Sequence, residues 1–341
     1  MLTLPQLNFY LMTSGRTLNL PPGYSSGILS GLTWGIDTTL LAIALALSAF
    51  YPDQGLLLAG SYICAVIHIF FETIVMTGVV AGTKGFSEVW YAARSKGGII
   101  AMVGGLAGGP IAMTCYLMSL EMLGAPISTT ITSTYPLIGA FLAFLLLREH
   151  TNAQIWIGAA ACVFGILYTG MGVDFDGSKM EPIGFLLALV TAIGWGFEAV
   201  ACRKAMDDHG LSPKAALLLR EYTCLIVYLL IAPLFLSRFG SISDTLSVLM
   251  HNGMPFVIVA IASCFGAFSM FAWYKSISKI GATRGVCLNS SYCIWTIIFV
   301  SIYFGIEPNS YIVTGAIITL AGIFLALWPK NIFSMGMNSD F

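Results

Sequence analysis

Charge is what this sequence has least of. Only 9% of its 341 residues are Asp, Glu, Lys or Arg, whereas 57% are hydrophobic and the mean hydropathy is +0.87. A soluble domain carries roughly 25% charged residues, so this chain cannot cover a globule with a solvated surface. The composition therefore predicts an integral membrane protein, in which backbone polar groups are satisfied inside helices or a closed barrel.

The short alternating segments of a barrel are also missing. The apolar stretches are instead close to the roughly 20 residues that a helix needs to cross a bilayer. Turn signals such as Tyr51-Pro52-Asp53 and Glu307-Pro308-Asn309 separate these stretches. The predicted fold class is an all-α integral membrane protein with ten transmembrane helices. They cover residues 27–50, 55–81, 98–123, 126–147, 154–171, 183–205, 214–237, 254–278, 282–304 and 310–329.

Motifs of catalysis and cofactor binding are absent from the sequence. None of the eight cysteines has CxxC spacing, so we interpret them as small buried thiols and not as a metal site. We find no glycine-rich phosphate loop followed by Lys-Ser/Thr, no HExxH and no Ser-His-Asp arrangement. We expect neither an enzyme nor a cofactor, a metal or a nucleic-acid partner. The N-terminal segment lacks a basic region before an apolar core, so no cleaved signal peptide is expected.

Basic residues are distributed unequally between the loops. With the N-terminus in the cytoplasm, twelve of the fifteen Lys and Arg residues fall at cytoplasmic helix ends. Lys179 and Arg238 fall on the outer side, and Arg220 lies inside a predicted helix. Because positive residues favour the cytoplasmic side, we predict a multi-pass protein of the plasma membrane with both termini cytoplasmic.

Two halves of the sequence repeat one another. The segment Trp34-Gly35-Ile36-Asp37 is echoed by Trp195-Gly196-Phe197-Glu198 at an offset of 161 residues. Further matches recur at an offset of 157, or within one residue of it. Gly124, Ala125, Ser133, Tyr135, Glu149 and Gly158 correspond to Gly281, Ala282, Ser290, Tyr292, Glu307 and Gly315. Three collinear blocks are difficult to explain as chance matches among small and aromatic residues.

The order of these echoes predicts two five-helix repeats, at residues 27–171 and 183–329. An outer linker at 172–182 joins them, and cytoplasmic segments at 1–26 and 330–341 flank them. Five is an odd number, so the second repeat enters the membrane from the opposite side and the repeat is inverted. Inverted repeats are typical of transporters, in which a pseudo-two-fold axis relates two open states around a midplane site.

The two repeats begin alike, as Gly27 … Trp34-Gly35 and Gly184 … Trp195-Gly196. A passage in the first runs from Tyr116 through Gly124-Ala125-Pro126 and Tyr135-Pro136 to Arg148-Glu149 and Gly158. These features resemble the EamA-type drug/metabolite transporter superfamily. The resemblance implies a central cavity lined by helices 1, 3, 4, 6, 8 and 9, with helices 5 and 10 peripheral. The second repeat departs from the pattern at Cys293, where the family's proline would stand.

In the predicted helix 98–123, four closely spaced glycines, Gly104, Gly105, Gly108 and Gly109, precede Pro110. Small residues four apart let helices approach closely. Pro110 lacks an N–H group and predicts a kink. The helix is therefore a candidate rocking element, and static packing is the alternative interpretation.

Asp37 and Glu198 are the leading candidates for substrate binding. Each lies inside a predicted helix, where an ionised side chain costs roughly 2.5–3.5 kcal/mol. Each also follows a tryptophan, Trp34 or Trp195, by three residues and so shares nearly the same helical face. A carboxylate beside an aromatic ring suits a cation. The alternative is a buried hydrogen bond between helices.

Other residues extend the predicted site. The candidates for an aromatic cage are Tyr116, Tyr135, Trp273 and Tyr292, and Asn289 is a further candidate binding residue. Aromatic residues in membrane helices more often serve packing or the interfacial belt.

Further charged residues lie in or near the predicted spans. His68 and Glu72 lie four residues apart on one face, and either relay a proton or form a local polar pair with Arg220 or Glu221. Glu121 is either a gate or an interfacial charge.

The leading functional hypothesis is a secondary active transporter of a small organic metabolite that works by alternating access. The expected substrate is a cationic or zwitterionic amine or amino acid, and a proton or sodium gradient is the candidate driving force. A second hypothesis keeps the fold but moves a neutral or anionic metabolite, with the acids as proton sites and Arg220 and Arg284 as anion partners. A third is an intramembrane enzyme or a receptor. The oligomeric state is left open.

Overall fold

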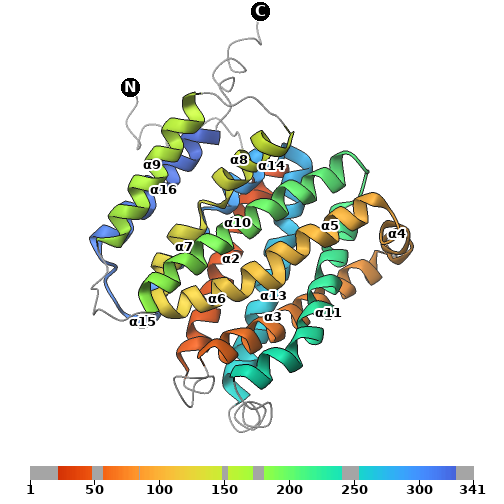
Figure 1. Cartoon of the computed structure of the whole chain (residues 1–341), viewed down its shortest axis with the longest axis horizontal. Helices are drawn as coiled ribbons and strands as arrows, with labels where there is room; N and C mark the ends of the chain where they lie inside the picture. The colour runs from red at the N-terminus through yellow and green to blue at the C-terminus, as the bar shows by residue number, and fades with distance from the viewer. Residues whose placement is uncertain are drawn as a thin grey trace, which may run out of the picture.

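The computed structural model describes residues 22–47, 57–83, 85–147, 153–171, 180–239 and 253–327. All regular structure within these ranges is helical (Figure 1). The first half comprises α2 (Pro22–Ala46), α3 (Leu57–Gly82), α4 (Phe86–Ala92), α5 (Lys96–Leu106), the π-helical turn η3 (Ala107–Ile111), α6 (Ala112–Leu123), α7 (Ala125–Thr132), α8 (Tyr135–Leu147) and α9 (Ala153–Gly170). The second comprises α10 (Met180–Asp207), α11 (Pro213–Phe239), α13 (Gly253–Ile280), α14 (Ala282–Asn289), α15 (Tyr292–Phe304) and α16 (Ser310–Leu327). The C-terminal segment predicted at 330–341, and most of the predicted N-terminal segment and linker, lie outside the described residues.

Seven helical segments of the described chain are long and apolar enough to cross a membrane. They are Gly23–Ala46, Gly60–Gly82, Lys96–Leu123, Pro182–Asp207, Pro213–Leu234, Gly253–Ile280 and Arg284–Phe304. The apolar stretches of α9 and α16 are shorter, and the predicted helix 126–147 is divided into α7 and α8. The prediction of an all-helical membrane protein is confirmed. The count of ten transmembrane helices stays a prediction, because these three segments are not among the seven.

The fourth helix of each repeat is interrupted at the echoed residues. α7 ends before Ser133 and α8 begins at Tyr135, while α14 ends before Ser290 and α15 begins at Tyr292. A glycine with positive φ precedes each pair, Gly124 at 77° and Gly281 at 85°. Residues with a Cβ rarely adopt this conformation, so glycine permits both turns. The echo in the sequence therefore corresponds to a shared backbone geometry.

A wide turn interrupts the third helix at the position of the predicted kink. Pro110 lies within η3, where the N–H of Ala112 donates to the carbonyl of Ala107, five residues earlier. Proline cannot donate a hydrogen bond and its ring clashes with the preceding turn, so the chain widens here. Within the described residues, the pseudo-equivalent α13 is continuous α-helix.

The two halves interlock by helix packing across the repeat boundary. α2 packs against α13, α11 against α3 and α5, and α10 against α5, α6 and α8. α9 packs against α16, and Figure 1 shows this pair together at one edge of the molecule. The resemblance implied such a peripheral position for these two helices. The central space is therefore bounded mainly by α2, α10 and α13.

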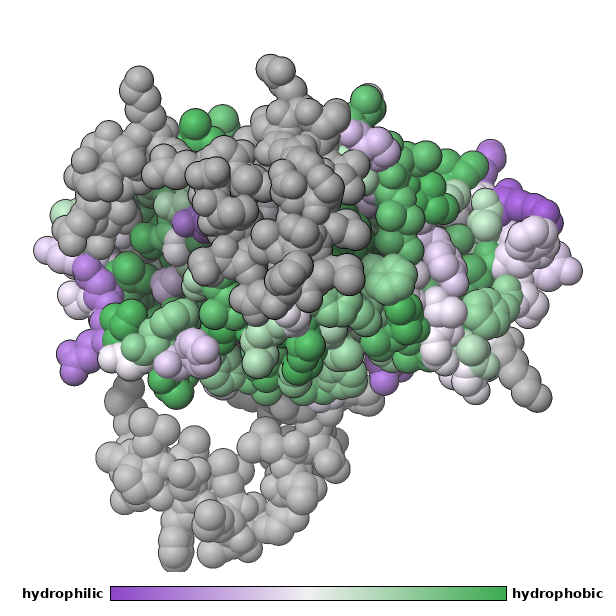
Figure 2. All heavy atoms as spheres, turned by 90° about the horizontal axis from the view of Figure 1, so that it is seen from below, coloured by the Kyte–Doolittle hydropathy of each residue, from purple (hydrophilic) through white to green (hydrophobic). Residues whose placement is uncertain are grey.

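The described surface is largely apolar. Leu167, Leu230, Leu234 and Ile302 all have side chains that are more than half exposed. In the face seen in Figure 2, hydrophobic residues dominate the described surface around and below the grey atoms, and hydrophilic ones lie mostly toward the two sides. A monomeric soluble protein rarely exposes so much contiguous apolar surface. This surface fits contact with lipid.

Candidate functional site

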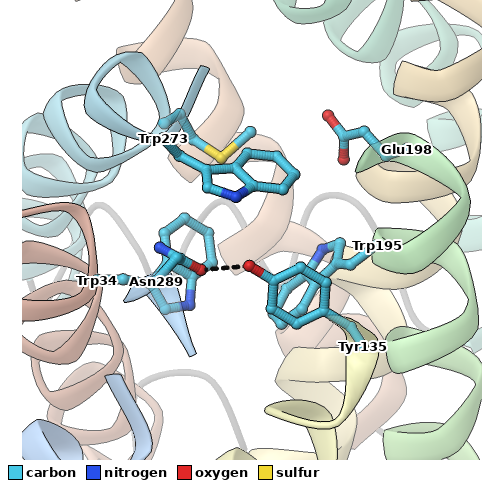
Figure 3. Close-up of a pocket in the computed structure, with 7 residues that line it drawn as sticks. Trp34, Tyr135, Trp195, Glu198, Trp273 and Asn289 are labelled. Atoms are coloured by element: carbon cyan, nitrogen blue, oxygen red, sulfur yellow. Dashed lines mark hydrogen bonds between the residues drawn. The ribbon is translucent and has the colours of Figure 1, made fainter. Parts of the chain in front are cut away.

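A small cavity, of about 20 Å³, lies where helices of both halves meet, between α2, α8, α10, α13 and α14 (Figure 3). The residues that line it are Trp34, Tyr135, Trp195, Glu198, Met270, Trp273 and Asn289. Six of the seven were predicted as substrate-binding residues from the sequence, and Met270 was not. Met270 lies three residues before Trp273 on the same helical face, so its place was available from spacing alone.

Four aromatic rings form the wall of the cavity. The centroids of Trp34 and Trp195 lie 5.6 Å apart with the rings nearly perpendicular, at 87°. Tyr135 lies 6.1 Å from Trp195 and 6.0 Å from Trp273, again edge to face. Such edge-to-face contacts hold aromatic rings in fixed relative orientations. Figure 3 shows the four rings arranged around a shared space.

A hydrogen-bonded chain fixes the polar part of the wall. Tyr135 Oη donates to Asn289 Oδ1 at 2.7 Å, and Asn289 Nδ2 donates to Ser30 Oγ at 2.6 Å. Ser30 in turn donates to the carbonyl of Ser269 at 2.9 Å. Trp273 Nε1 is buried and has no hydrogen-bond partner among the described residues. In Figure 3 this nitrogen faces the space beside Asn289. The cavity thus offers one unused donor.

Glu198 brings a carboxylate to the cavity. Its Oε1 accepts hydrogen bonds from Arg220 Nε at 3.0 Å and from Tyr274 Oη at 2.9 Å. Its Oε2 is buried and has no partner among the described residues. A Cβ at Gly108 of η3 would collide with this carboxyl group, so glycine leaves the room that the carboxylate occupies. One oxygen of Glu198 is therefore a buried acceptor beside Gly108 without a hydrogen-bond partner among the described residues.

Behind the cavity, Glu198 leads into a buried cluster of ionisable side chains. Arg220 Nη1 lies 3.0 Å from Glu221 Oε1 and 3.9 Å from Glu72 Oε2. His68 Nδ1 lies 3.5 Å from the same oxygen of Glu72, and His68 Nε2 lies 2.8 Å from Asp37 Oδ1. The cluster connects α10, α11, α3 and α2.

The cluster contains more acidic groups than basic ones. Four carboxyl groups face one guanidinium and one imidazole. Besides Glu198, each of the other three acids has an oxygen without a partner among the described residues: Asp37 Oδ2, Glu72 Oε1 and Glu221 Oε2. Uncompensated charge is costly away from water. The cluster therefore has capacity for further protons or for a cation.

Three predicted substrate-binding residues lie outside the cavity wall. Asp37 is fully buried and contacts His68 instead. Tyr116 and Tyr292 lie behind Trp195, with ring centroids 4.9 Å and 6.4 Å from it. The hydroxyl groups of both tyrosines are hydrogen-bonded to threonines, Thr38 and Thr132. These two rings support the wall.

The remaining predicted residues lie at two different places. His68 and Glu72 join the cluster, as the alternative of a polar pair with Arg220 and Glu221 anticipated. Glu121 accepts a hydrogen bond from Ser61 Oγ at 3.0 Å and connects α6 with α3. The direct pairing of Arg220 with Glu198 was not predicted, because the two residues are 22 positions apart and the turn from α10 to α11 lies between them.

An all-helical membrane fold with a small cavity between its two halves defines a transporter-like, multi-pass membrane protein. The chain belongs to the EamA-like transporter family, whose model matches residues 21–171 and 182–328. Membership identifies a membrane transporter of small molecules and, at this level, supports the expectation that the chain is not an enzyme.

Two individual proteins are similar to the chain. Protein LicB of Haemophilus influenzae is 27% identical over 315 residues, which cover 91% of this chain and 98% of LicB. A crystal structure of another protein has a TM-score of 0.58 at 16% identity and covers 92% of this chain and 99% of its own. That second likeness concerns the fold alone.

Proposed function

We propose that the chain is a secondary active transporter of a small organic cation or zwitterion that carries an amine, working by alternating access. The proposal depends on one observation: a carboxylate, Glu198, lines the same cavity as four aromatic rings. These rings belong to Trp34, Trp195, Trp273 and Tyr135. An inverted repeat provides two related open states around such a site.

The chemistry of the lining favours a cation. The faces of Trp and Tyr attract cations, by about 2 kcal/mol or more when the cation is desolvated. Glu198 adds a carboxylate, and the lining residues include neither Lys nor Arg. Asn289 and Trp273 provide neutral polar contacts for the remainder of the substrate.

We propose a proton as the coupling ion, with His68 and Glu72 as its carriers. Histidine changes its charge near physiological pH more readily than other side chains. His68 touches both Glu72 and Asp37, and Arg220 connects Glu72 to Glu198. A proton held in the cluster therefore has an electrostatic route to the substrate cavity.

A thermal-shift screen of the detergent-purified protein tests the substrate class. The panel holds quaternary and primary amines, amino acids, sugars and carboxylates, run on the wild type, on Glu198→Gln and on Asp37→Asn. A ligand of the folded state raises the melting temperature by mass action. We expect amines to shift the wild type and Asp37→Asn but to have little effect on Glu198→Gln. Equal shifts by neutral or anionic compounds in all three proteins would overturn the cation proposal.

A neutral metabolite is the second candidate, because Arg220 already compensates the charge of Glu198. The buried acids would then serve as proton sites only. In the same screen this candidate predicts that sugars or amides shift the wild type and that Glu198→Gln preserves the shift.

A further inference from the structure

We propose that Arg220 is a built-in counterion of the substrate cavity: it neutralises Glu198 while the cavity is empty and is displaced from it by a cationic substrate. The inference rests on the proposed function. It explains how the Glu198 carboxylate can stay ionised in the empty cavity, because Arg220 compensates its charge. It assigns to Arg220 a positioning role, because the guanidinium does not line the cavity.

The geometry places Glu198 between two cation positions. On its protein side, Oε1 accepts from Arg220 Nε at 3.0 Å. Glu198 also lines the cavity, and its Oε2 is buried beside Gly108 without a partner among the described residues. A substrate cation in the cavity and the guanidinium behind it therefore compete for one carboxylate.

Two other carboxylates can accept the Arg220 guanidinium when it leaves Glu198. Its Nη1 already donates to Glu221 Oε1 at 3.0 Å and lies 3.9 Å from Glu72 Oε2. Glu72 Oε1 and Glu221 Oε2 are buried acceptors without partners among the described residues. A guanidinium has five N–H donors in a fixed fork, so a small shift can exchange one carboxylate for another without exposing the charge.

Glu198 is held in place independently of Arg220. Tyr274 Oη donates to Glu198 Oε1 at 2.9 Å, and Cys202 Sγ donates to that same hydroxyl group. Because Tyr274 belongs to α13, this bond anchors the carboxylate to a second helix of the same repeat. The anchor remains when the guanidinium departs.

The other groups around Arg220 are consistent with a small movement. Gly105 and Gly109 of the third helix face it, and a Cβ at Gly105 would meet its side chain. The charged and titratable neighbours of Arg220 are Glu198 and Cys202 on α10, Glu221, Cys224 and Tyr228 on α11, Glu72 on α3, and Tyr274 on α13. Every neighbour that carries a fixed negative charge is a carboxylate that can receive the guanidinium.

The exchange makes an unusual prediction: the loss of Arg220 strengthens binding and stops transport. Without the competing guanidinium, Glu198 is fully available to the cation, so we expect roughly tenfold tighter binding, as for a charged hydrogen bond. Uptake falls, because an unopposed cation–carboxylate pair is slow to release. An ordinary structural role for Arg220 predicts weaker binding.

The experiment measures tetramethylammonium and ethylammonium binding by calorimetry at pH 8, and their counterflow in liposomes. Arg220→Gln is compared with Glu221→Gln, which removes one acceptor for the displaced guanidinium and should weaken binding. The double variant Arg220→Gln with Glu221→Gln removes one charge of each sign and keeps the measurement possible if Arg220→Gln does not fold. Arg220→Lys should restore most of the uptake.

The outcomes separate this inference from the function on which it rests. Tighter binding with reduced uptake in Arg220→Gln or in the double variant supports the exchange. Weaker binding in the double variant overturns the exchange while leaving the cation site intact. If neither ion binds the wild type, the proposed substrate class itself fails.

Discussion

The two acids that follow a Trp-Gly pair occupy matching positions in the two repeats, yet their surroundings differ. Glu198 lines the cavity and pairs with Arg220 and Tyr274. Asp37 lies outside the cavity wall and pairs with His68 at 2.8 Å. Both side chains are fully buried. Both acids belong to the buried cluster, but only Glu198 also lines the cavity.

The tryptophans of the same motif keep the symmetry that the acids lose. Trp34 and Trp195 both line the cavity and touch each other across it, with centroids 5.6 Å apart. The two repeats thus contribute equivalent tryptophans to the cavity, but only the second repeat contributes a carboxylate. Four predictions test this difference between the two sides.

The largest loss of stability is expected when the basic partner of either acid is removed. Arg220→Met leaves three buried carboxyl groups without a guanidinium, which should lower the free energy of unfolding by about 3–5 kcal/mol. His68→Leu removes a smaller interaction, worth about 1–3 kcal/mol. Denaturant unfolding in mild detergent measures both values. Equal losses would mean that the two sides carry equivalent ion pairs.

A methyl group added beside the carboxylate should have the next largest effect. Gly108→Ala places a Cβ against the Glu198 side chain, so overpacking should cost about 1–3 kcal/mol and weaken amine binding. Gly266→Ala places its Cβ against Glu72 and His68 and should destabilise the protein while affecting binding less. Gly78→Ala is the control, because nothing lies within 4 Å of its Cβ. Unchanged amine binding in Gly108→Ala would contradict the placement of Glu198.

Exchange of the acid lengths should change affinity more than stability. Glu198→Asp withdraws the carboxylate by one methylene and should weaken amine binding by roughly tenfold, the value of one charged contact. Asp37→Glu should leave the affinity within about twofold, because Asp37 does not line the cavity. Calorimetric titration with tetramethylammonium compares the two variants. A larger loss in Asp37→Glu would reverse the assignment of the two acids.

The smallest effect is expected from two tyrosines at echoed positions. Tyr135→Phe and Tyr292→Phe remove the hydroxyl groups that bond mainly to Asn289 and to Thr132, and each should cost about 1 kcal/mol of stability. Only Tyr135 lines the cavity, so only its variant should alter ligand preference. The thermal-shift panel distinguishes them. The same change of preference in both variants would show that the supporting ring acts on the substrate as well.

The repeat, the membrane class and most of the cavity wall could be predicted from sequence because they depend on local patterns. Trp34 and Trp195 belong to two copies of one motif. Tyr135 and Tyr292 each follow a turn of small residues at echoed positions. The side chains of a motif lie at fixed angles on a helix, so matching motifs predict matching faces.

The charge partners could not be predicted in the same way. The contact between Arg220 and Glu198 depends on how α10 and α11 pack and on the space left by Gly105 and Gly108. Whether the Asp37 side chain points toward the cavity or toward His68 depends likewise on its rotamer and its tertiary neighbours. The spacing of residues in the sequence does not determine either.

The wide turn at Ala107–Ile111 has a consequence for the energies of the two states of a transport cycle. Lys96–Leu123 and Gly253–Ile280 both contain 28 residues at an offset of 157, yet only the first includes this turn. One residue is about 1.5 Å of rise and 100° of rotation. Two identical halves would give the inward-open and outward-open forms the same energy. A turn present in one half removes that degeneracy, so we expect the empty protein to rest with its cavity open to one preferred side.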